Sequence, residues 1–326
     1  MASITQIISW IVQDIYHGWS PLPLPPAGSF AGQTVCVVGA STGLGLAAAE
    51  HCVNLGAAEV IITSRDNRRA NVAKEHLEGK AARAAVATTS GAADSSPPKT
   101  ECRVTAMILD MNRYSSVVAF ANDLKQIRKG HGGIDFILLN AAVIQSRYIQ
   151  SPEGWQEELQ VNTLSNVLLT LLLLPWLRAE RKNRSSPAHL AFTTSTASIA
   201  TDVSKWEDWT SSGEGILNHW NKEEHWPPGL SGGSDGNMEP GMAKTEIQRH
   251  VLEGSPFLQF LAPIIIPAIF KTSENGVRVL IMGGLTTEEE HYAHSRQPNG
   301  EEATVARMAR DHRRPGQSRP GGQRRT

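Results

Sequence analysis

The sequence predicts an α/β domain built on a doubly wound parallel sheet. Short apolar segments that suit strands alternate with longer segments that suit helices between residues 33 and 195. Strands separated by helices pair in parallel, and helices then cover both faces of the sheet. A glycine-rich turn directly follows the first apolar segment. Because crossover connections are right-handed, this order of elements gives a doubly wound sheet.

The first four elements form a βαβα unit. An apolar strand, QTVCVVGA, is followed by a helix that ends at Gly56, by the strand AEVIITSR and by a polar helix. The later elements repeat the alternation. The expected strands are 33–40, 58–65, 103–110, 134–142 and 188–195, and the expected helices are 44–56, 66–79, 114–129 and 156–178.

Three segments around this unit are expected to be irregular or peripheral. Residues 1–30 form an N-terminal arm whose apolar pattern suits an amphipathic helix rather than a cleaved signal, with weak membrane-surface contact as the alternative. Residues 79–100 form an inserted loop, because they lack a period and contain Pro97–Pro98. Residues 296–326 form a disordered basic tail rich in Arg, Gly and Gln.

Past the last predicted strand the pattern is less regular. Residues 204–240 lose periodicity and form a lid-like region with Trp206, Trp209, Trp220 and Trp226 among charges and glycines. Helical segments are expected at 243–254 and 273–285. The main domain therefore covers 31–295.

Composition limits the function classes. The 326 residues include 40% hydrophobic ones, and 31 basic and 32 acidic side chains leave a net charge of -1, so no overall field favours nucleic acid or an anionic membrane. The longest apolar run, Val167–Leu177, is about half of the ~20 residues that a bilayer span needs, which predicts a buried helix and no transmembrane span. Cys36, Cys52 and Cys102 show neither disulfide nor zinc-site spacing, which predicts a reducing compartment, the cytoplasm.

The glycine turn GASTGLG, Gly39 to Gly45, lies where a dinucleotide site requires it, between a strand and a helix. Glycines allow the backbone to approach a pyrophosphate, and the amides and dipole of a helix N-terminus favour its charge. The sequence therefore predicts a cofactor site at this turn. A purely structural turn is the alternative.

The end of the second strand, TSRD, bears on whether the cofactor is NADP or NAD. A guanidinium at this place accepts the 2′-phosphate of NADP, whereas a carboxylate bonds the free ribose hydroxyl of NAD. Arg65 at the strand tip favours NADP because its planar donors pair with phosphate oxygens. A shift of one residue would present Asp66 and favour NAD.

With these features the chain resembles the short-chain dehydrogenase/reductase family, whose fold is the Rossmann fold. The matching motifs are VGASTGLG, LDMN at Asp110, NAAV at Asn140, VNTLS at Asn162, FTTSTAS around Ser195 and PGMAKT at Pro240. They occur in the family's order over roughly residues 30–290. The residues of these motifs are most similar to those of the fungal branch found in secondary-metabolite pathways.

The resemblance implies the site residues. Ser195 would bond the substrate carbonyl, with Thr194 and Ser198 as alternatives in register, and Asn162 would support the catalytic lysine through water. A helix cap is the alternative for Asp110, and a plain first-turn helix position is the alternative for Thr245. The implied cofactor contacts are Gly39, Ser41, Gly43, Leu44, Gly45, Arg65, Asp110, Asn140, Arg178 and Thr245.

The proton donor of the family is missing from the sequence. The four tyrosines are Tyr16, Tyr114, Tyr148 and Tyr292, so none lies between Ser195 and Pro240, where Tyr-x-x-x-Lys belongs. The family places a helix and a sixth strand there, so we expect a Rossmann fold that lacks the catalytic helix and strand six. Either the recorded chain omits a segment, as a splicing error would cause, or it is a degraded relative.

By resemblance, the expected function is NADP-dependent hydride transfer to or from a carbonyl or alcohol of a small hydrophobic metabolite, in fungal secondary metabolism. A non-catalytic dinucleotide-binding protein is the alternative. Nucleic-acid binding is disfavoured because the basic tail lacks interleaved aromatic residues. The family's homo-oligomer would be weakened, because the missing helix belongs to the usual dimer face.

Overall fold

The core of the protein is a sheet of five parallel strands. The computed structural model describes residues 23–89, 102–145, 147–184, 186–194, 204–226, 277–278, 280–281 and 285. The strands pair in the order β3-β2-β1-β4-β5. This order confirms the doubly wound sheet, with the change of direction between β1 and β4. The strands are β1 (Thr34–Val38), β2 (Glu59–Ser64), β3 (Arg103–Ile108), β4 (Phe136–Leu139) and β5 (His189–Phe192).

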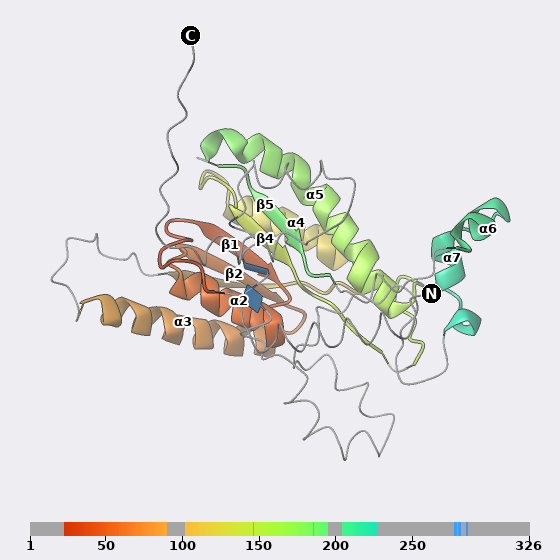
Figure 1. The fold of residues 1–326 in the computed structure, drawn as a ribbon, viewed down its shortest axis with the longest axis horizontal. Helices are drawn as coiled ribbons and strands as arrows, with labels where there is room; N and C mark the ends of the chain where they lie inside the picture. The colour runs from red at the N-terminus through yellow and green to blue at the C-terminus, as the bar shows by residue number, and fades with distance from the viewer. Residues whose placement is uncertain are drawn as a thin grey trace, which may run out of the picture.

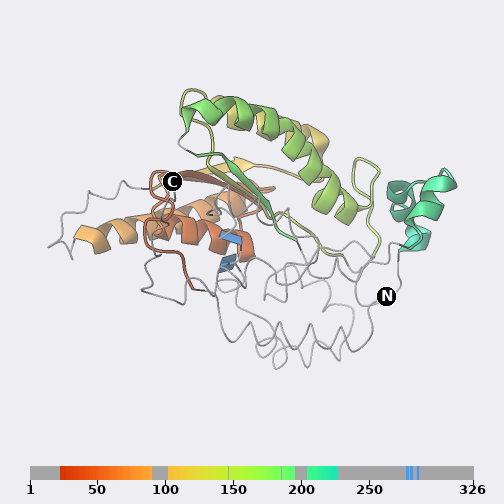
Figure 2. The same cartoon turned by 45° about the horizontal axis from the view of Figure 1, so that its top comes forward.

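Helices cover both faces of this sheet (Figure 1). α2 (Gly43–Asn54) and α3 (Asn67–Thr89) lie on one face, and α4 (Tyr114–Ile127) and α5 (Ser165–Ala179) lie on the other. Figure 2 shows the sheet between the two helix layers. A parallel sheet that is enclosed in this way needs strands that are apolar on both faces. The unbroken apolar runs of β1 and β4 meet that need.

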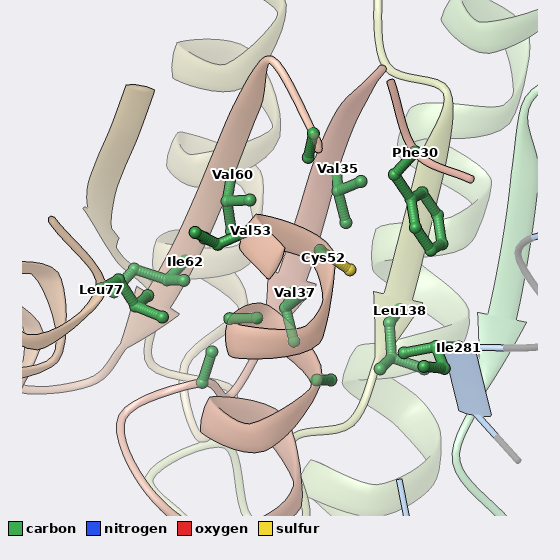
Figure 3. Close-up of a cluster of buried hydrophobic side chains, with 14 of the residues drawn as sticks. Phe30, Val35, Val37, Cys52, Val53, Val60, Ile62, Leu77, Leu138 and Ile281 are labelled. Atoms are coloured by element: carbon green, nitrogen blue, oxygen red, sulfur yellow. The ribbon is translucent and has the colours of Figure 1, made fainter. Parts of the chain in front are cut away.

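The two faces of β1 contribute to two separate hydrophobic clusters. Val35 and Val37 point to the α2 and α3 side, together with Phe30, and Figure 3 shows this cluster around the last turns of α2. Cys36 and Val38 belong to the cluster that α4 and α5 cover. Side chains alternate across a strand, so this division follows directly from the period of two.

Residues just before the predicted domain start at residue 31 also pack in the core. Phe30 is completely buried, and its ring stacks on Phe136 with centroids 6.0 Å apart. The amide of Phe30 also donates to the carbonyl of Leu55 at 3.1 Å. Residues 1–22 of the predicted arm and the whole predicted tail lie outside the described residues.

The first half of the predicted inserted loop is helical instead. α3 continues to Thr89, ten residues past Gly79. Residues 80–89 contain five alanines, the best helix former, and their lack of an apolar period concealed a helix that only partly faces the core. Ala81 is still in the hydrophobic cluster. Residues 90–100 lie outside the described residues.

α5 continues a π-helical stretch, Leu159–Leu164, and carries the apolar run that the sequence assigned to a buried helix. Leu169 and Leu173 are fully buried, whereas Leu171 is 62% exposed. The helical stretch Leu159–Asn183 has the length and apolar composition of a membrane span. One side of the helix is buried through Leu169 and Leu173, and core helices can meet the same criterion.

After β5 the described chain forms a small helical unit, which we call the 204–226 unit. It contains α6 (Trp206–Ser211), α7 (Ile216–Trp220) and a 3-10 helix, Glu223–His225, and none of these helices buries a residue. It stands apart from the sheet in both views (Figures 1 and 2). The catalytic helix and the sixth strand were expected to be missing before Pro240. Residues 227–240 of this region lie outside the described residues.

Val277 and Ile281 show that a late part of the chain returns to the sheet. Both are completely buried in the cluster of α2 and α3, and Figure 3 places Ile281 beside Leu138 of β4. The described positions 277–278 and 280–281 are helical. They fall within the helix expected at 273–285.

Candidate cofactor site

A cleft of about 280 Å³ opens at the carboxyl edge of the sheet. Parallel strands all end at this edge, and ligands bind there near the change of strand direction. The loops after β1, β2, β3 and β4 form its walls. It is lined by Gly39, residues 41–44, Ser64, Arg65, Arg69, residues 109–112, residues 140–145 and Val161.

The glycine turn between β1 and α2 forms the floor of the cleft. Gly39 and Gly43 have φ angles of 78° and 60°, which favour glycine. A Cβ on Gly39 would lie 2.6 Å from the Cα of Ala141, and a Cβ on Gly45 would lie 2.1 Å from the carbonyl oxygen of Gly39. These two glycines therefore let the turn pack against the β4 loop and against itself.

The N-terminus of α2 is available to an anion. Its N-cap residue, Thr42, makes no side-chain capping hydrogen bond, so the amides of the first turn have no side-chain acceptor there. Ser41, Gly43 and Leu44 line the cleft beside these amides. This arrangement fits the pyrophosphate of a dinucleotide.

At the tip of β2, the structure separates the roles of Arg65 and Asp66. Asp66 precedes α3, and its carboxylate accepts the amide hydrogen of Arg69 at 3.1 Å. This backbone hydrogen bond lowers the pKa of Asp66. Arg65 and Arg69 line the cleft, whereas Asp66 does not. The carboxylate that would bind the ribose of NAD thus caps a helix instead.

The loop after β3 forms one wall of the cleft and contains Asp110. Asp110 lines the cleft, and its Oδ1 accepts the amide of Asn112 at 3.0 Å. The other carboxylate oxygen lies 3.5 Å from Nε of Arg113. The hydroxyl of Ser165 donates to the carbonyl of Met111 at 2.5 Å and ties this loop to α5.

Asn140 and Asn162 both hold backbone segments beside the cleft. The amide of Asn140 donates to Gly39 O at 3.2 Å, and its oxygen accepts the hydroxyl of Thr193 at 3.1 Å. Asn162 lies in the π-helical stretch and makes two 2.9 Å hydrogen bonds with the backbone of Val143. π-Helical turns of this kind often occur at functional sites.

The remaining expected residues are not all brought together. Arg178 is exposed in the last turn of α5 and does not line the cleft. Arg184 bonds both Leu177 O and the carbonyl of Ile134, just before β4, which places this end of α5 at the amino edge of the sheet. Arg178 is therefore at the wrong edge for a cofactor contact. Ser195 and Thr245 lie outside the described residues.

Arg69, Asn112 and Gln145 are among the cleft residues that were not expected from the sequence. Arg69 follows Arg65 by one helical turn, so its spacing could have indicated a shared face. Asn112 and Gln145 have no such signal. Their side chains both donate hydrogen bonds to the carboxylate of Glu157, which lies far from them in sequence.

The 204–226 unit contributes none of the residues that line the cleft. It is attached to the loop after β4 through Asn221, which donates to Gly154 O at 3.1 Å and accepts the amide of Gln156 at 2.6 Å. The hydroxyl of Tyr148 also donates to the Asn221 carbonyl at 2.8 Å. Trp226 lies edge-on to Tyr148. Trp226 therefore packs on the loop after β4, and Trp209 stacks on His219 within the unit.

Within this unit Glu214, His219 and His225 place possible metal-ligand atoms within 4.8 Å of one another. The His219 and His225 rings stack with centroids 3.7 Å apart and 18° between planes. Nearly parallel rings cannot direct their nitrogen lone pairs at one ion. The ammonium of Lys222 also bonds the Glu214 carboxylate. We therefore assign no metal to this cluster.

The sheet order and the cleft at its carboxyl edge define the class of protein first: a doubly wound α/β protein with a nucleotide-type site. No protein-family model matches the chain. Among solved structures, the L-sorbose reductase from Gluconobacter frateurii, in complex with NADPH and L-sorbose, superposes with a TM-score of 0.50. The superposition covers 82% of this chain and 94% of that one at 17% identity, which shows the fold alone.

Curated relatives supply the family. The short-chain dehydrogenase/reductase ffsI of Aspergillus flavipes is 35% identical over 176 residues, which are 53% of this chain and 45% of that protein. The short chain dehydrogenase macD of Penicillium terrestre is 34% identical over 206 residues, which are 63% of this chain and 58% of that protein. The chain thus spans about half the length of the curated relatives it matches. Its matched part is similar to proteins of the short-chain dehydrogenase/reductase family, which the motifs also resemble.

Proposed function

We propose that this chain binds NADP(H) in the cleft at the carboxyl edge of its sheet. The observation that carries the proposal is the division of roles after β2, where Arg65 and Arg69 line the cleft while Asp66 caps α3. Two guanidinium groups suit a 2′-phosphate, and the competing carboxylate is engaged elsewhere. The pyrophosphate would lie on the first turn of α2, and the adenosine would lie along the Asp110 wall.

The proposed reaction of the family unit is hydride transfer between NADP(H) and a carbonyl or alcohol of a small hydrophobic metabolite. Bound NADPH supplies the hydride for such a reaction. The residues of this chain bind and orient it: α2 holds the charge, and Asn140 and Asn162 fix the loops that carry the nicotinamide-side wall. A role in fungal secondary metabolism rests on the resemblance of the motifs.

The sequence contains no Tyr-x-x-x-Lys segment, which carries the proton donor of the family. Tyr114 starts α4 and Tyr148 bonds Asn221, and neither lines the cleft. An acid catalyst contributes roughly 10²–10⁴-fold in rate. We therefore propose cofactor binding with little or no carbonyl reduction for this chain, and turnover for a form that also contains a Tyr-x-x-x-Lys segment. A purely non-catalytic binding protein is the second candidate.

Two measurements test the proposal. Calorimetry with the full chain should register NADPH binding and weaker NADH binding, and absorbance at the NADPH band should show almost no loss with carbonyl substrates. Sequencing the transcript between the codons for Ser231 and Pro240 would show whether a segment has been omitted. If neither NADPH nor NADH gives a heat of binding, the proposed binding site is refuted. If the chain reduces carbonyl substrates at an ordinary reductase rate, the proposal that it lacks a proton donor is refuted.

We also propose a reducing compartment such as the cytoplasm. All three cysteines, Cys36, Cys52 and Cys102, are free and buried. Burial raises the pKa of Cys36 to about 12 and that of Cys102 to about 11. Proteins of oxidising compartments usually pair such thiols, so buried free thiols support this location.

A further inference from the structure

We infer that Glu157 is a positioning residue that holds the two walls of the cofactor cleft at a fixed separation. One carboxylate oxygen accepts the side-chain amide of Asn112, and the other accepts the side-chain amide of Gln145. Asn112 belongs to the loop after β3, and Gln145 belongs to the loop after β4. Both line the cleft. The inference rests on the proposed function only for its effect on NADP(H).

The burial of this carboxylate calls for an explanation. Glu157 is 8% exposed. Buried carboxylates are normally paired with a cation, because an unpaired buried charge is costly. Among the described residues no Lys, Arg or His forms an ion pair with Glu157, and its carboxylate accepts hydrogen bonds from two neutral side-chain amides. A well-packed apolar side chain would suit the fold alone at least as well.

A carboxylate does what no neutral side chain of this size does at the site. It only accepts hydrogen bonds, so it fixes both amides with their NH₂ groups facing inward. The amide orientation of Asn112 leaves its Oδ1 buried without a partner among the described residues. An unsatisfied acceptor costs free energy until a donor reaches it, and a ligand in the adjoining cleft is placed to supply one.

The backbone around Glu157 is itself well anchored. Its amide donates to Ile149 O at 2.8 Å, and the next residue, Glu158, accepts the amide of Gln145 at 2.5 Å. Glu157 lies two residues before the π-helical stretch whose Asn162 holds Val143. One helix start therefore holds the backbone of the loop after β4, and among the described residues the Glu157 side chain links that loop to Asn112.

The test uses Glu157→Gln in the full chain. A glutamine has one acceptor oxygen, so one of the two amides loses its partner at unchanged volume. We expect the Kd for NADPH to rise about tenfold, since hydrogen bonds to charged groups are among the stronger ones. Adding Asn112→Asp should rescue binding, because the new amide then donates to Asp at 112 while its oxygen still accepts from Gln145.

Glu153→Gln is the matched control. Glu153 lies four residues earlier and accepts the amide of Tyr114 at 2.8 Å at the start of α4, away from the cleft lining. This variant should keep the wild-type Kd within about twofold.

Hydrogen–deuterium exchange of the ligand-free chain separates the two proposals. Glu157→Gln should speed exchange in residues 109–112 and 140–145 together, with rescue by Asn112→Asp, whereas Glu153→Gln should leave both segments unchanged. Wild-type exchange in either segment of Glu157→Gln overturns the positioning role. If instead the exchange changes as expected but the wild-type chain binds no NADPH, the positioning role stands and the proposed function fails.

Discussion

Arg65 and Arg69 act at the scale of single side chains, and the consequence for the cofactor can be measured. Replacing either with Ala should weaken NADPH binding roughly 10–100-fold, because each removes charge-assisted hydrogen bonds to the proposed 2′-phosphate. NADH binding should change much less, since NADH lacks this phosphate. Calorimetry with both coenzymes gives the comparison.

Arg68→Ala is the control for these two variants. Arg68 is exposed in the same helix turn and does not line the cleft. Equal losses for NADPH and NADH in Arg65→Ala would mean that this guanidinium contacts a part common to both coenzymes. If Arg68→Ala weakens NADPH binding as much as the other two variants, the effect comes from the overall positive charge at the start of α3 and not from specific contacts.

The turn into α2 shows how one element depends on two glycines. Gly45→Ala should destabilise the chain and abolish cofactor binding, because the new Cβ would lie 2.1 Å from Gly39 O and 2.7 Å from Nδ2 of Asn140. Relief of this overlap would move the turn that forms the cleft floor. Thermal unfolding and NADPH calorimetry measure the two effects.

Gly79→Ala in α3 is the matched control for Gly45→Ala. A Cβ at Gly79 would meet only Nη2 of Arg83, at 3.9 Å, within an ordinary helix. This change should stabilise the chain by about 0.5–1 kcal/mol, since alanine is the better helix former. Similar melting temperatures for the two alanine variants would show that the turn accommodates a Cβ at Gly45, which would contradict the prediction.

The elements differ in how far the sequence predicts them. The five strands and the doubly wound parallel sheet follow from apolar runs and their alternation with helices, because a strand that is buried on both faces must be apolar along its length. α3 was predicted too short, since residues 80–89 depend on helix propensity more than on an apolar face. The π-helical stretch has no local signature, because its irregular turn is fixed by contacts such as that of Asn162 with Val143.

The site divides in the same way. The glycine turn and Arg65 could be predicted, because their chemistry is contained within a few consecutive residues. Asn112, Gln145 and Glu157 could not, since their hydrogen bonds join two loops and a helix start that meet only in the folded chain. Arg178 was assigned to the site by resemblance and lies at the opposite edge.

At the scale of the whole molecule, a buried ion pair connects segments at the amino edge of the sheet. Glu59 of β2 and Arg128 after α4 are 6% and 8% exposed, and their side chains lie 2.5 Å apart. Arg128 also bonds Thr34 of β1 at 3.0 Å and Gly133 O at 3.0 Å. The pair therefore links the starts of β1 and β2 to the segment that leads into β4.

Arg128→Met should lower the free energy of unfolding by about 3–5 kcal/mol, because it leaves the Glu59 carboxylate buried with one cation fewer. Denaturant titration measures the change. Arg103→Ala is the control, because Arg103 pairs with the same carboxylate but is 66% exposed, so its loss should cost only about 0–1 kcal/mol. Equal costs for the two variants would mean that burial does not set the strength of this pair.

The outer face of α5 affects the assembly of the whole molecule. Val167, Leu171 and Leu174 are 48%, 62% and 45% exposed, and they follow one another at three- and four-residue spacing on one side of the helix. A contiguous apolar stripe of this kind promotes association between chains. Leu171→Lys should therefore lower the weight-average mass at high protein concentration, as measured by light scattering, and leave the unfolding free energy within about 0.5 kcal/mol.

Leu173→Ala provides the contrast: Leu173 is fully buried, so this change should cost about 2–5 kcal/mol without removing the stripe. If Leu171→Lys associates as strongly as the unchanged chain, the contact between copies lies elsewhere than on α5.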